Sequence, residues 1–149
     1  MGAGIAQVSV DSGKYTVLLK DKDEKGVSRG EKIIIDDLNV KVKRKRMTNF
    51  KFCETTARLI PLHDGVESWK RHFATADLVI EAVFEEISVK HKVLQEMEAV
   101  LPPHAIFASN TSAIPIASIA EGASRPERVI GMHYFSPVPK MPLLVRNSS

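Results

Sequence analysis

Apolar and polar positions along the chain alternate in patterns that predict helices and strands in turn. Residues 2–10 carry apolar side chains with helical character, and the β-branched run TVLL at 16–19 is typical of a short strand. From Asp23 to Arg46, apolar residues recur at roughly helical spacing between Val27 and Val42, and the segment ends in cations that suit a helix C terminus. The chain therefore opens with a helix, a strand and a long helix.

The next segments continue this alternation. RLIPL at 58–62 is expected as a strand that Pro61 confines to an edge or an end of its sheet. The near-continuous apolar run LVIEAV at 78–83 predicts a strand buried on both faces. Residues 88–101 predict a helix with Ser88 as its N-cap. Its expected buried stripe consists of Val89, Val93, Met97 and Leu101.

Further strands are expected at 105–109 and 129–133, with a short helix at 116–121 between them. Strands that alternate with helices form right-handed βαβ units and a parallel sheet with helices on both faces. In such a fold a first strand precedes a glycine-rich turn and the first helix, whereas this sequence starts at that turn with MGAGIAQV. The predicted fold class is therefore α/β, with a Rossmann-like, doubly wound, mainly parallel sheet that lacks its first strand.

Composition is that of a folded protein, because 44% of the 149 residues are hydrophobic and 26% are charged. The net charge is +3, and Lys and Arg are concentrated in one run, KVKRKR at 41–46. This run is either a solvated helix end or a site for a phosphate-bearing ligand, and nucleic acid ranks third because no aromatic residues are interleaved. The lone cysteine, Cys53, excludes an intramolecular disulfide and argues against a zinc site in this chain. It also indicates a reducing compartment. We expect no membrane span and no metal.

Part of a dinucleotide-binding fingerprint is visible near the start. The pattern G-x-G-x-x-G uses its third glycine for packing of the helix against the sheet, and Gly2 stands at that place, followed by Gly4. About 20 residues later, Asp21 follows the predicted strand at 16–19, which is the second strand of the complete fold, where an acidic side chain would bind the ribose hydroxyls of the cofactor. Small residues at a helix start and an Asp at a strand end are, however, common in any α/β protein.

Four longer segments identify a family. MGAGIAQV, VIEAVFEEISVKHKVL, IFASNTSA and RPERVIGMHYFSPV resemble the NAD-binding domain of L-3-hydroxyacyl-CoA dehydrogenases, most closely that of multifunctional mitochondrial members, from Met1 to about Leu144. The resemblance implies that residues 1–149 form an incomplete NAD-binding domain and that the family's helical C-terminal domain is absent. It also implies NAD as cofactor, an acyl-CoA as substrate and a mitochondrial location. No targeting segment is visible, so a chain that begins at Met1 is expected in the cytosol.

The resemblance also implies site residues. His133 matches the catalytic histidine, and imidazole suits proton transfer from a hydroxyl because its unperturbed pKa is about 6.5. Ser112 matches the residue that hydrogen-bonds the substrate oxygen near the nicotinamide. Cofactor contacts are implied for Glu85, Lys90 and Ser136, in addition to Gly2, Gly4, Asp21 and Ser112. The phosphates of coenzyme A are assigned to Lys45, with Lys41 as the alternative. Each of these residues also has an ordinary structural interpretation as a turn, capping, core or surface residue.

One position departs from the family. A glutamate on the strand after HYFSPV orients the catalytic histidine in these enzymes, and the corresponding residue here is Val145. Loss of such a carboxylate costs on the order of 10⁴-fold in rate. The expected function is NAD-dependent oxidation of L-3-hydroxyacyl-CoA to 3-oxoacyl-CoA in fatty acid β-oxidation. The alternatives are a non-catalytic module that binds NAD or acyl-CoA, and a structural protein such as the family's lens-crystallin members. The missing strand also predicts self-association through exposed sheet edges.

Overall fold

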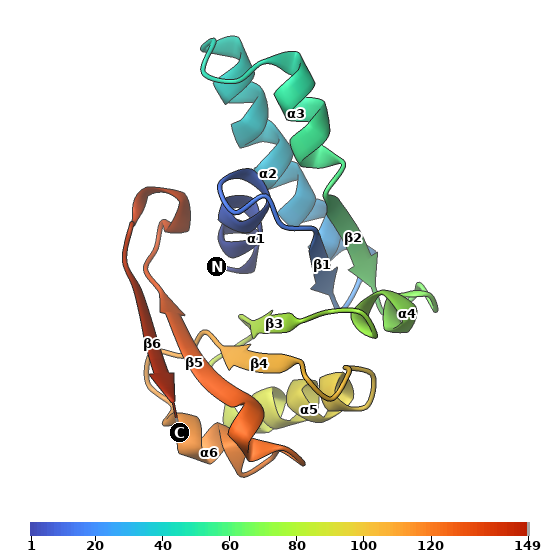
Figure 1. Ribbon diagram of the computed structural model, residues 1–149, viewed down its shortest axis with the longest axis vertical. Coiled ribbons are helices and arrows are strands. Elements are labelled where there is room, and N and C mark those ends of the chain that lie inside the picture. The colour runs from blue at the N-terminus through green and yellow to red at the C-terminus, as the bar shows by residue number, and fades with distance from the viewer. Residues whose placement is uncertain (149) are drawn as a thin grey trace. The chain divides into compact units, whose positions relative to one another are not determined.

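The computed structural model describes residues 1–148, which form helices and strands that largely alternate along the chain (Figure 1). In chain order the elements are α1 (Gly2–Asp11), β1 (Val17–Asp21), α2 (Glu24–Lys43), α3 (Asn49–Thr56), β2 (Leu59–His63), α4 (Trp69–Phe73), β3 (Leu78–Glu81), α5 (Ile87–Glu98), β4 (Ile106–Ser109), α6 (Ile116–Ala120), β5 (Val129–Tyr134) and β6 (Leu144–Ser148). Two short 3-10 helices lie at Pro126–Arg128 and Val138–Lys140. The chain divides into two compact units, each of which is described by itself.

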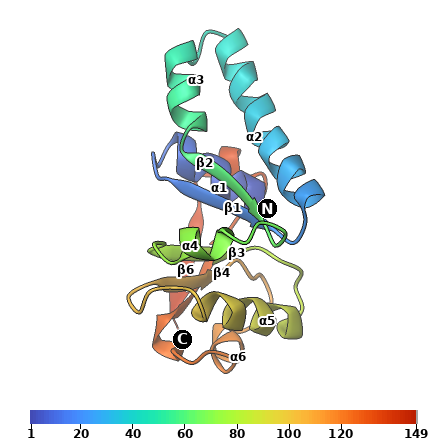
Figure 2. The ribbon, with the colours of Figure 1, turned by 90° about the vertical axis from the view of Figure 1, so that its right-hand side faces the viewer.

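The first unit contains residues 1–69 and 137–139. Its two strands, β1 and β2, are parallel, and Pro61 is tolerated because β2 is an edge strand, as expected. Helices α1 and α2 pack against these strands, and α3 runs beside α2 as a helical hairpin (Figure 2). The hydrophobic core of this unit is formed by Ala6, Val10, Ile34, Leu38 and Leu59.

Helix α2 begins one residue after the predicted start, because the Asp23 carboxylate accepts a hydrogen bond from the Gly26 N–H at 2.8 Å and acts as the N-cap. The helix ends at Lys43, earlier than the predicted Arg46. Lys45 has a φ of 58° in the turn that follows, and this turn leads into α3, which the sequence pattern did not predict. The basic run therefore forms the end of α2 and the connection to α3.

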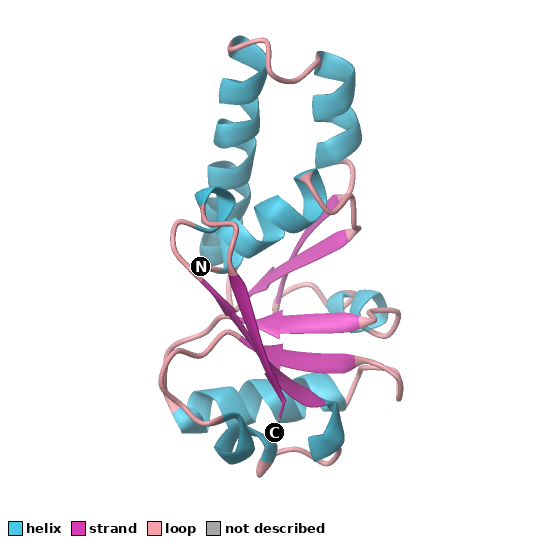
Figure 3. Ribbon diagram, turned by 60° about the vertical axis from the view of Figure 1, so that its left-hand side comes forward, coloured by secondary structure: helices cyan, strands magenta, loops and turns pink. Residues whose placement is uncertain are grey.

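The second unit contains residues 70–136 and those from Lys140 onward. Its strands form one sheet in the order β3-β4-β5-β6, in which the first three are parallel and β6 is antiparallel to β5. Figure 3 shows this sheet in magenta, and α5 and α6 lie together on one side of β4 in Figures 1 and 2. The buried side chains between these layers include Leu94, Phe107, Ile119 and Val129.

Two predictions about α5 were wrong. The helix begins at Ile87 with Glu86 as N-cap, and the Ser88 hydroxyl donates a hydrogen bond to the Glu86 carboxylate at 2.5 Å instead of capping the helix. The buried stripe contains Lys90, Leu94, Met97 and Leu101, while Val89 and Val93 are only half-buried. Met97 and Leu101 are buried as predicted, whereas the first two positions of the stripe are displaced by one residue, so that a lysine occupies the first position.

The prediction that β3 is buried on both faces was also wrong. Leu78 is 43% exposed, and the only fully buried residue of the strand is Glu81. Among the described residues, β3 pairs only with β4 and β1 pairs only with β2. The predicted fold class, a Rossmann-like α/β fold with a mainly parallel sheet, is confirmed.

Within the described part of the chain, no helix is long and apolar enough to cross a membrane. The same residues contain no group of three or more His, Cys, Asp or Glu side chains that could hold a metal ion.

Candidate active site

A loop after β4 presents Ser112 and is held by one carboxylate. The backbone N–H groups of Ser112 and Ala113 donate to Glu85 Oε1 at 2.9 and 3.1 Å, and the Thr111 hydroxyl donates to the same oxygen. Thr111 also accepts a hydrogen bond from the Ile114 N–H at 3.0 Å, which closes the turn. No other residue of 1–148 forms a hydrogen bond with the Ser112 hydroxyl, so this group is available to a ligand.

These donors determine the charge of Glu85. Burial acts to raise the pKa of its carboxyl, but the hydrogen bonds from Thr111, Ser112 and Ala113, together with Lys90, outweigh burial and lower the pKa to about 2. Glu85 is therefore ionised at neutral pH, and each of its hydrogen bonds from the loop has a charged acceptor.

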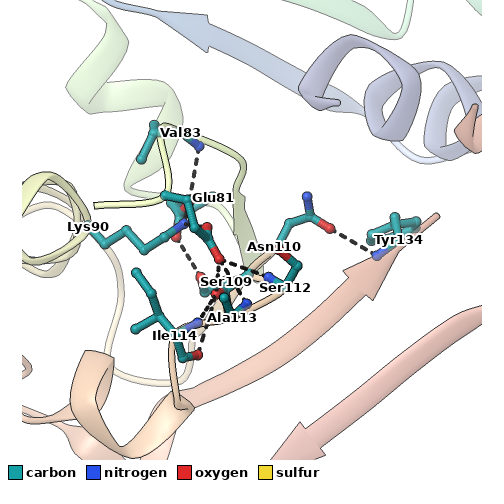
Figure 4. A network of polar contacts seen from close by, with 11 residues as sticks. Glu81, Val83, Lys90, Ser109, Asn110, Ser112, Ala113, Ile114 and Tyr134 are labelled. Carbon is teal, nitrogen blue, oxygen red and sulfur yellow. Dashed lines mark hydrogen bonds and ion pairs between the residues drawn. The ribbon is translucent and has the colours of Figure 1, made fainter. Parts of the chain in front are cut away.

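Beneath the loop lies a buried ion pair between β3 and α5 (Figure 4). Lys90 Nζ lies 2.7 Å from Glu81 Oε1, and both side chains are fully inaccessible to solvent. Glu81 Oε2 accepts a hydrogen bond from the buried Ser109 hydroxyl at 2.7 Å. A side chain with no exposed surface cannot contact a nucleotide, so in this conformation Lys90 contacts Glu81 and Glu85, which is 3.2 Å away, instead of the cofactor implied by the resemblance.

His133 lies on β5 and lines a cavity of about 170 Å³, which Ser112 and Asn147 also line. Its ring packs edge-on against Phe135, with ring centroids 4.7 Å apart. The Nδ1 atom is buried and has no hydrogen-bond partner among the described residues. The structure thus brings Ser112 and His133, the two residues predicted to be catalytic, to one small cavity.

The residue directly opposite His133 on β6 is Val145. Cross-strand partners in an antiparallel pair have Cβ atoms about 4.5–5.5 Å apart on the same face of the sheet, so a carboxylate at this position could reach the imidazole. Valine offers no acceptor, which accounts for the unpaired Nδ1. Asn147, whose strand partner Gly131 lies two residues before His133, was not predicted to line the cavity.

The first unit carries the predicted glycines and Asp21. The N–H groups of Gly2, Ala3 and Gly4 lie in the first turn of α1, before the first helical hydrogen bond from Ile5 to Met1, and no side chain caps them. A Cβ at Gly4 would lie 3.2 Å from the Val138 side chain, so this glycine allows close packing.

Asp21 is exposed at the carboxyl end of β1, and its side chain accepts a hydrogen bond from the Lys22 N–H at 2.7 Å. A Cβ at Gly26 would lie only 2.5 Å from the Asp21 carboxyl carbon. The space that holds the Asp21 carboxylate therefore depends on Gly26, which the sequence interpretation had missed. The spacing of Asp21, the N-cap Asp23 and Gly26 is the sequence signal that could have identified this glycine.

The two candidate lysines of the basic run differ in their surroundings. Lys41 Nζ lies 2.7 Å from Asp11 and 3.7 Å from Asp37, so its charge is already paired. Lys45 has no such partner among residues 1–148, and it lines a surface pocket of about 390 Å³ together with Arg46 and Thr48. Ser136 is exposed just after β5 and is likewise without a described hydrogen-bond partner.

Comparison with known proteins identifies the family of the chain. Residues 1–146 match the family model described as 3-hydroxyacyl-CoA dehydrogenase, NAD binding domain. The fatty acid oxidation complex subunit alpha of Shewanella baltica is 44% identical over 144 residues, which are 97% of this chain and 20% of that protein. This chain therefore spans about one fifth of the length of such relatives.

Solved structures show the same fold. The 3-hydroxybutyryl-CoA dehydrogenase of Escherichia coli K12 matches with a TM-score of 0.89 and 39% identity, covering 98% of this chain and 30% of that one. The (S)-3-hydroxybutyryl-CoA dehydrogenase of Ralstonia eutropha matches with a TM-score of 0.89 and 31% identity, covering 100% and 52%. The chain belongs to the family of 3-hydroxyacyl-CoA dehydrogenase NAD-binding domains.

Proposed function

We propose that this chain carries the proton-transfer and NAD-binding residues for oxidation of an L-3-hydroxyacyl-CoA to the 3-oxoacyl-CoA in fatty acid β-oxidation. The observation that carries the proposal is the cavity lined by both Ser112 and His133, in a chain of this family. A volume of about 170 Å³ admits the hydroxyl-bearing carbon and its neighbours, but not a whole coenzyme A thioester.

Each polar group in the cavity has a proposed task. The free Ser112 hydroxyl donates a hydrogen bond to the substrate oxygen, and His133 takes the hydroxyl proton on Nε2 because Nδ1 is buried. The Glu85 carboxylate holds the loop so that Ser112 stays in place. NAD supplies the hydride acceptor when it is bound.

The residues present fit NAD in chemical type. The uncapped N–H groups at the start of α1 are donors suited to a diphosphate, and the exposed Asp21 carboxylate is an acceptor suited to ribose hydroxyls. Because Gly26 leaves room for that carboxylate, the first unit carries the groups for the adenosine portion.

The pocket at the end of α2 offers charges suited to the phosphate groups of coenzyme A. Lys45 and Arg46 are cations without a carboxylate partner in the described chain, and they line this pocket together with Thr48. Phosphate groups of coenzyme A would be attracted by these charges.

A titration with NADH, followed by cofactor fluorescence, tests the proposal, with circular dichroism as the control for folding. Saturable binding is expected, and Asp21→Ala should weaken it at least about tenfold if the carboxylate binds the ribose. The exposed neighbour Glu24 supplies the matched variant Glu24→Ala, which should bind as the unaltered protein does. A folded chain that binds no NADH would contradict the proposal.

The second candidate is a non-catalytic module that binds NAD or acyl-CoA. It is favoured by the unpaired Nδ1 of His133 and by the valine opposite it. Binding of NADH without reduction of acetoacetyl-CoA would support this candidate over the enzyme.

We also propose that the open edge of β3 pairs with a second copy of the chain. The Ile106 N–H donates to the Asp77 carbonyl and the Asn110 N–H donates to the Glu81 carbonyl, so the alternation of a parallel pair leaves the backbone groups of Leu78 and Ile80 on the open side. Light scattering should therefore find a mass that grows with concentration. Ile80→Pro removes one open donor without disturbing the β4 ladder and should reduce the association. A monomer at every concentration would contradict this.

A further inference from the structure

We propose that Lys90 is a positioning residue, whose buried ammonium fixes Glu85 and, through Glu85, the loop that presents Ser112. The importance of this role for catalysis rests on the proposed function, whereas the coupling of Lys90 to the loop through Glu85 does not. Figure 4 shows Lys90 extending from its helix toward Glu81, next to the loop that carries Ser112 and Ala113.

Glu81 is held firmly in place because both of its carboxylate oxygens accept hydrogen bonds. Its Oε1 accepts hydrogen bonds from Lys90 Nζ at 2.7 Å and from the Val83 N–H at 3.0 Å, and its Oε2 accepts from Ser109 Oγ at 2.7 Å. Lys90, Glu81 and Ser109 are all buried. The ammonium is therefore held at one position between β3, β4 and α5.

Glu85 joins this buried group to the loop because its two oxygens have different partners. Oε2 lies 3.2 Å from Lys90 Nζ, whereas Oε1 accepts the hydrogen bonds from Thr111, Ser112 and Ala113. Rotation of the carboxylate away from Lys90 would break all the loop contacts together. The position of the Ser112 backbone thus depends on a cation that does not contact it.

Charge makes the dependence stronger. One ammonium lies between two carboxylates, so removing its charge leaves Glu81 and Glu85 facing each other without a counterion. Glu81 is buried and cannot move to solvent, whereas Glu85 is 35% exposed and can. We expect Glu85 to turn outward and to release the loop.

A purely structural role for Lys90 predicts something different. If the lysine only neutralises Glu81, its loss should affect β3 and α5 but leave the Ser112 and Ala113 amides as they were. Methionine could fill the same place in the stripe beside Leu94 without the cost of a buried charge, so packing alone does not require a lysine there.

Hydrogen exchange of backbone amides, measured by NMR on the ¹⁵N-labelled chain without cofactor, separates the two roles. In Lys90→Met, the Ser112 and Ala113 amides should exchange at least about tenfold faster, which is the loss expected for a hydrogen bond to a charged acceptor. Glu85→Gln should have the same effect at these two amides. The control Lys92→Met alters an exposed lysine on the same helix and should change neither amide.

Lys90→Met leaves the charge of Glu81 buried and unpaired, which can prevent folding. In that case the double variant Glu81→Gln/Lys90→Met, which removes both charges, takes the place of the single variant in the test. Unchanged protection of Ser112 and Ala113 in a folded Lys90 variant would overturn the proposal. Glu85→Gln offers a second test that leaves the core intact, since the ¹⁵N shift of the Lys90 ammonium should change in it. An unchanged shift would also overturn the coupling. Faster loop exchange in a Lys90 variant, when the unaltered folded chain itself binds no NADH, would instead count against the proposed function alone.

Discussion

His133 and Val145 are direct partners across the antiparallel strands β5 and β6, and the buried Nδ1 atom of His133 has no hydrogen-bond partner within residues 1–148. A side chain on the opposite strand, at the distance where an acceptor would reach the imidazole, is therefore apolar. This pair of residues distinguishes the two candidate functions, the enzyme and the non-catalytic module, because an imidazole that no acceptor orients is a poor base.

Val145→Glu should supply the missing acceptor. The new carboxylate is expected to accept a hydrogen bond from Nδ1–H, which fixes the tautomer with Nε2 free to take a proton. Reduction of acetoacetyl-CoA by NADH should become faster, by up to about 10⁴-fold.

The ¹⁵N shifts of the imidazole report the tautomer independently of turnover. Val145→Gln keeps a similar shape without the charge and should give a smaller gain. If the shifts show the expected tautomer and the rate is still unchanged, the non-catalytic module is the better description.

Glu85→Gln should change the pH dependence of stability. The pKa of Glu85 is lowered in the folded chain to about 2, from an ordinary value of 4.5, so its contribution is present above about pH 4.5 and is lost as the pH falls toward 2. Urea unfolding should show the unaltered chain to be more stable than the variant at pH 6, by a margin that narrows over that range. Glu96→Gln, on the exposed side of α5, should leave the profile unchanged. A margin that stays constant down to pH 2 would mean that Glu85 does not hold the loop.

Ser112→Ala and Thr111→Val should have different effects. The Ser112 backbone, not its hydroxyl, contacts Glu85, so alanine keeps the loop in place and removes only the free hydroxyl. We expect about a 10- to 100-fold loss of acetoacetyl-CoA reduction, measured in the Val145→Glu background, with an unchanged melting temperature. Thr111→Val removes a hydroxyl that donates to Glu85, and should speed amide exchange in the loop. Full activity of Ser112→Ala would exclude the proposed contact with the substrate oxygen.

Lys45→Ala and Lys41→Ala test which cation binds the phosphates of coenzyme A. Lys45 lines the pocket at the end of α2, so its loss should weaken coenzyme A binding several-fold, as measured by calorimetry, with the largest difference at low salt. Lys41 is paired with Asp11, so its loss should cost about 0.2–1 kcal/mol of stability and leave the affinity unchanged. The reverse pattern would assign the phosphates to Lys41.

The sequence by itself determined the alternation of strands and helices, and with it the fold class, because buried strands and amphipathic helices impose their periods on the positions of apolar residues. Ser112, His133 and Val145 were identified through the resemblance of their segments to the family, and not through that alternation. The sequence could not supply α3, because this short helix contains too few apolar residues to show a period.

Only the tertiary structure decided which polar groups meet. Lys90 looked like a surface residue or a cofactor contact, yet α5 is rotated so that this lysine enters the buried stripe with Leu94 and Met97, where Glu81 neutralises it. The ion pair between Lys41 and Asp11 joins two helices that are distant in the sequence. The space for the Asp21 carboxylate depends on close packing against Gly26, which the pattern of apolar residues does not show. Such contacts depend on how elements are rotated and on which charges lose water together, and neither is encoded in the local period of a sequence.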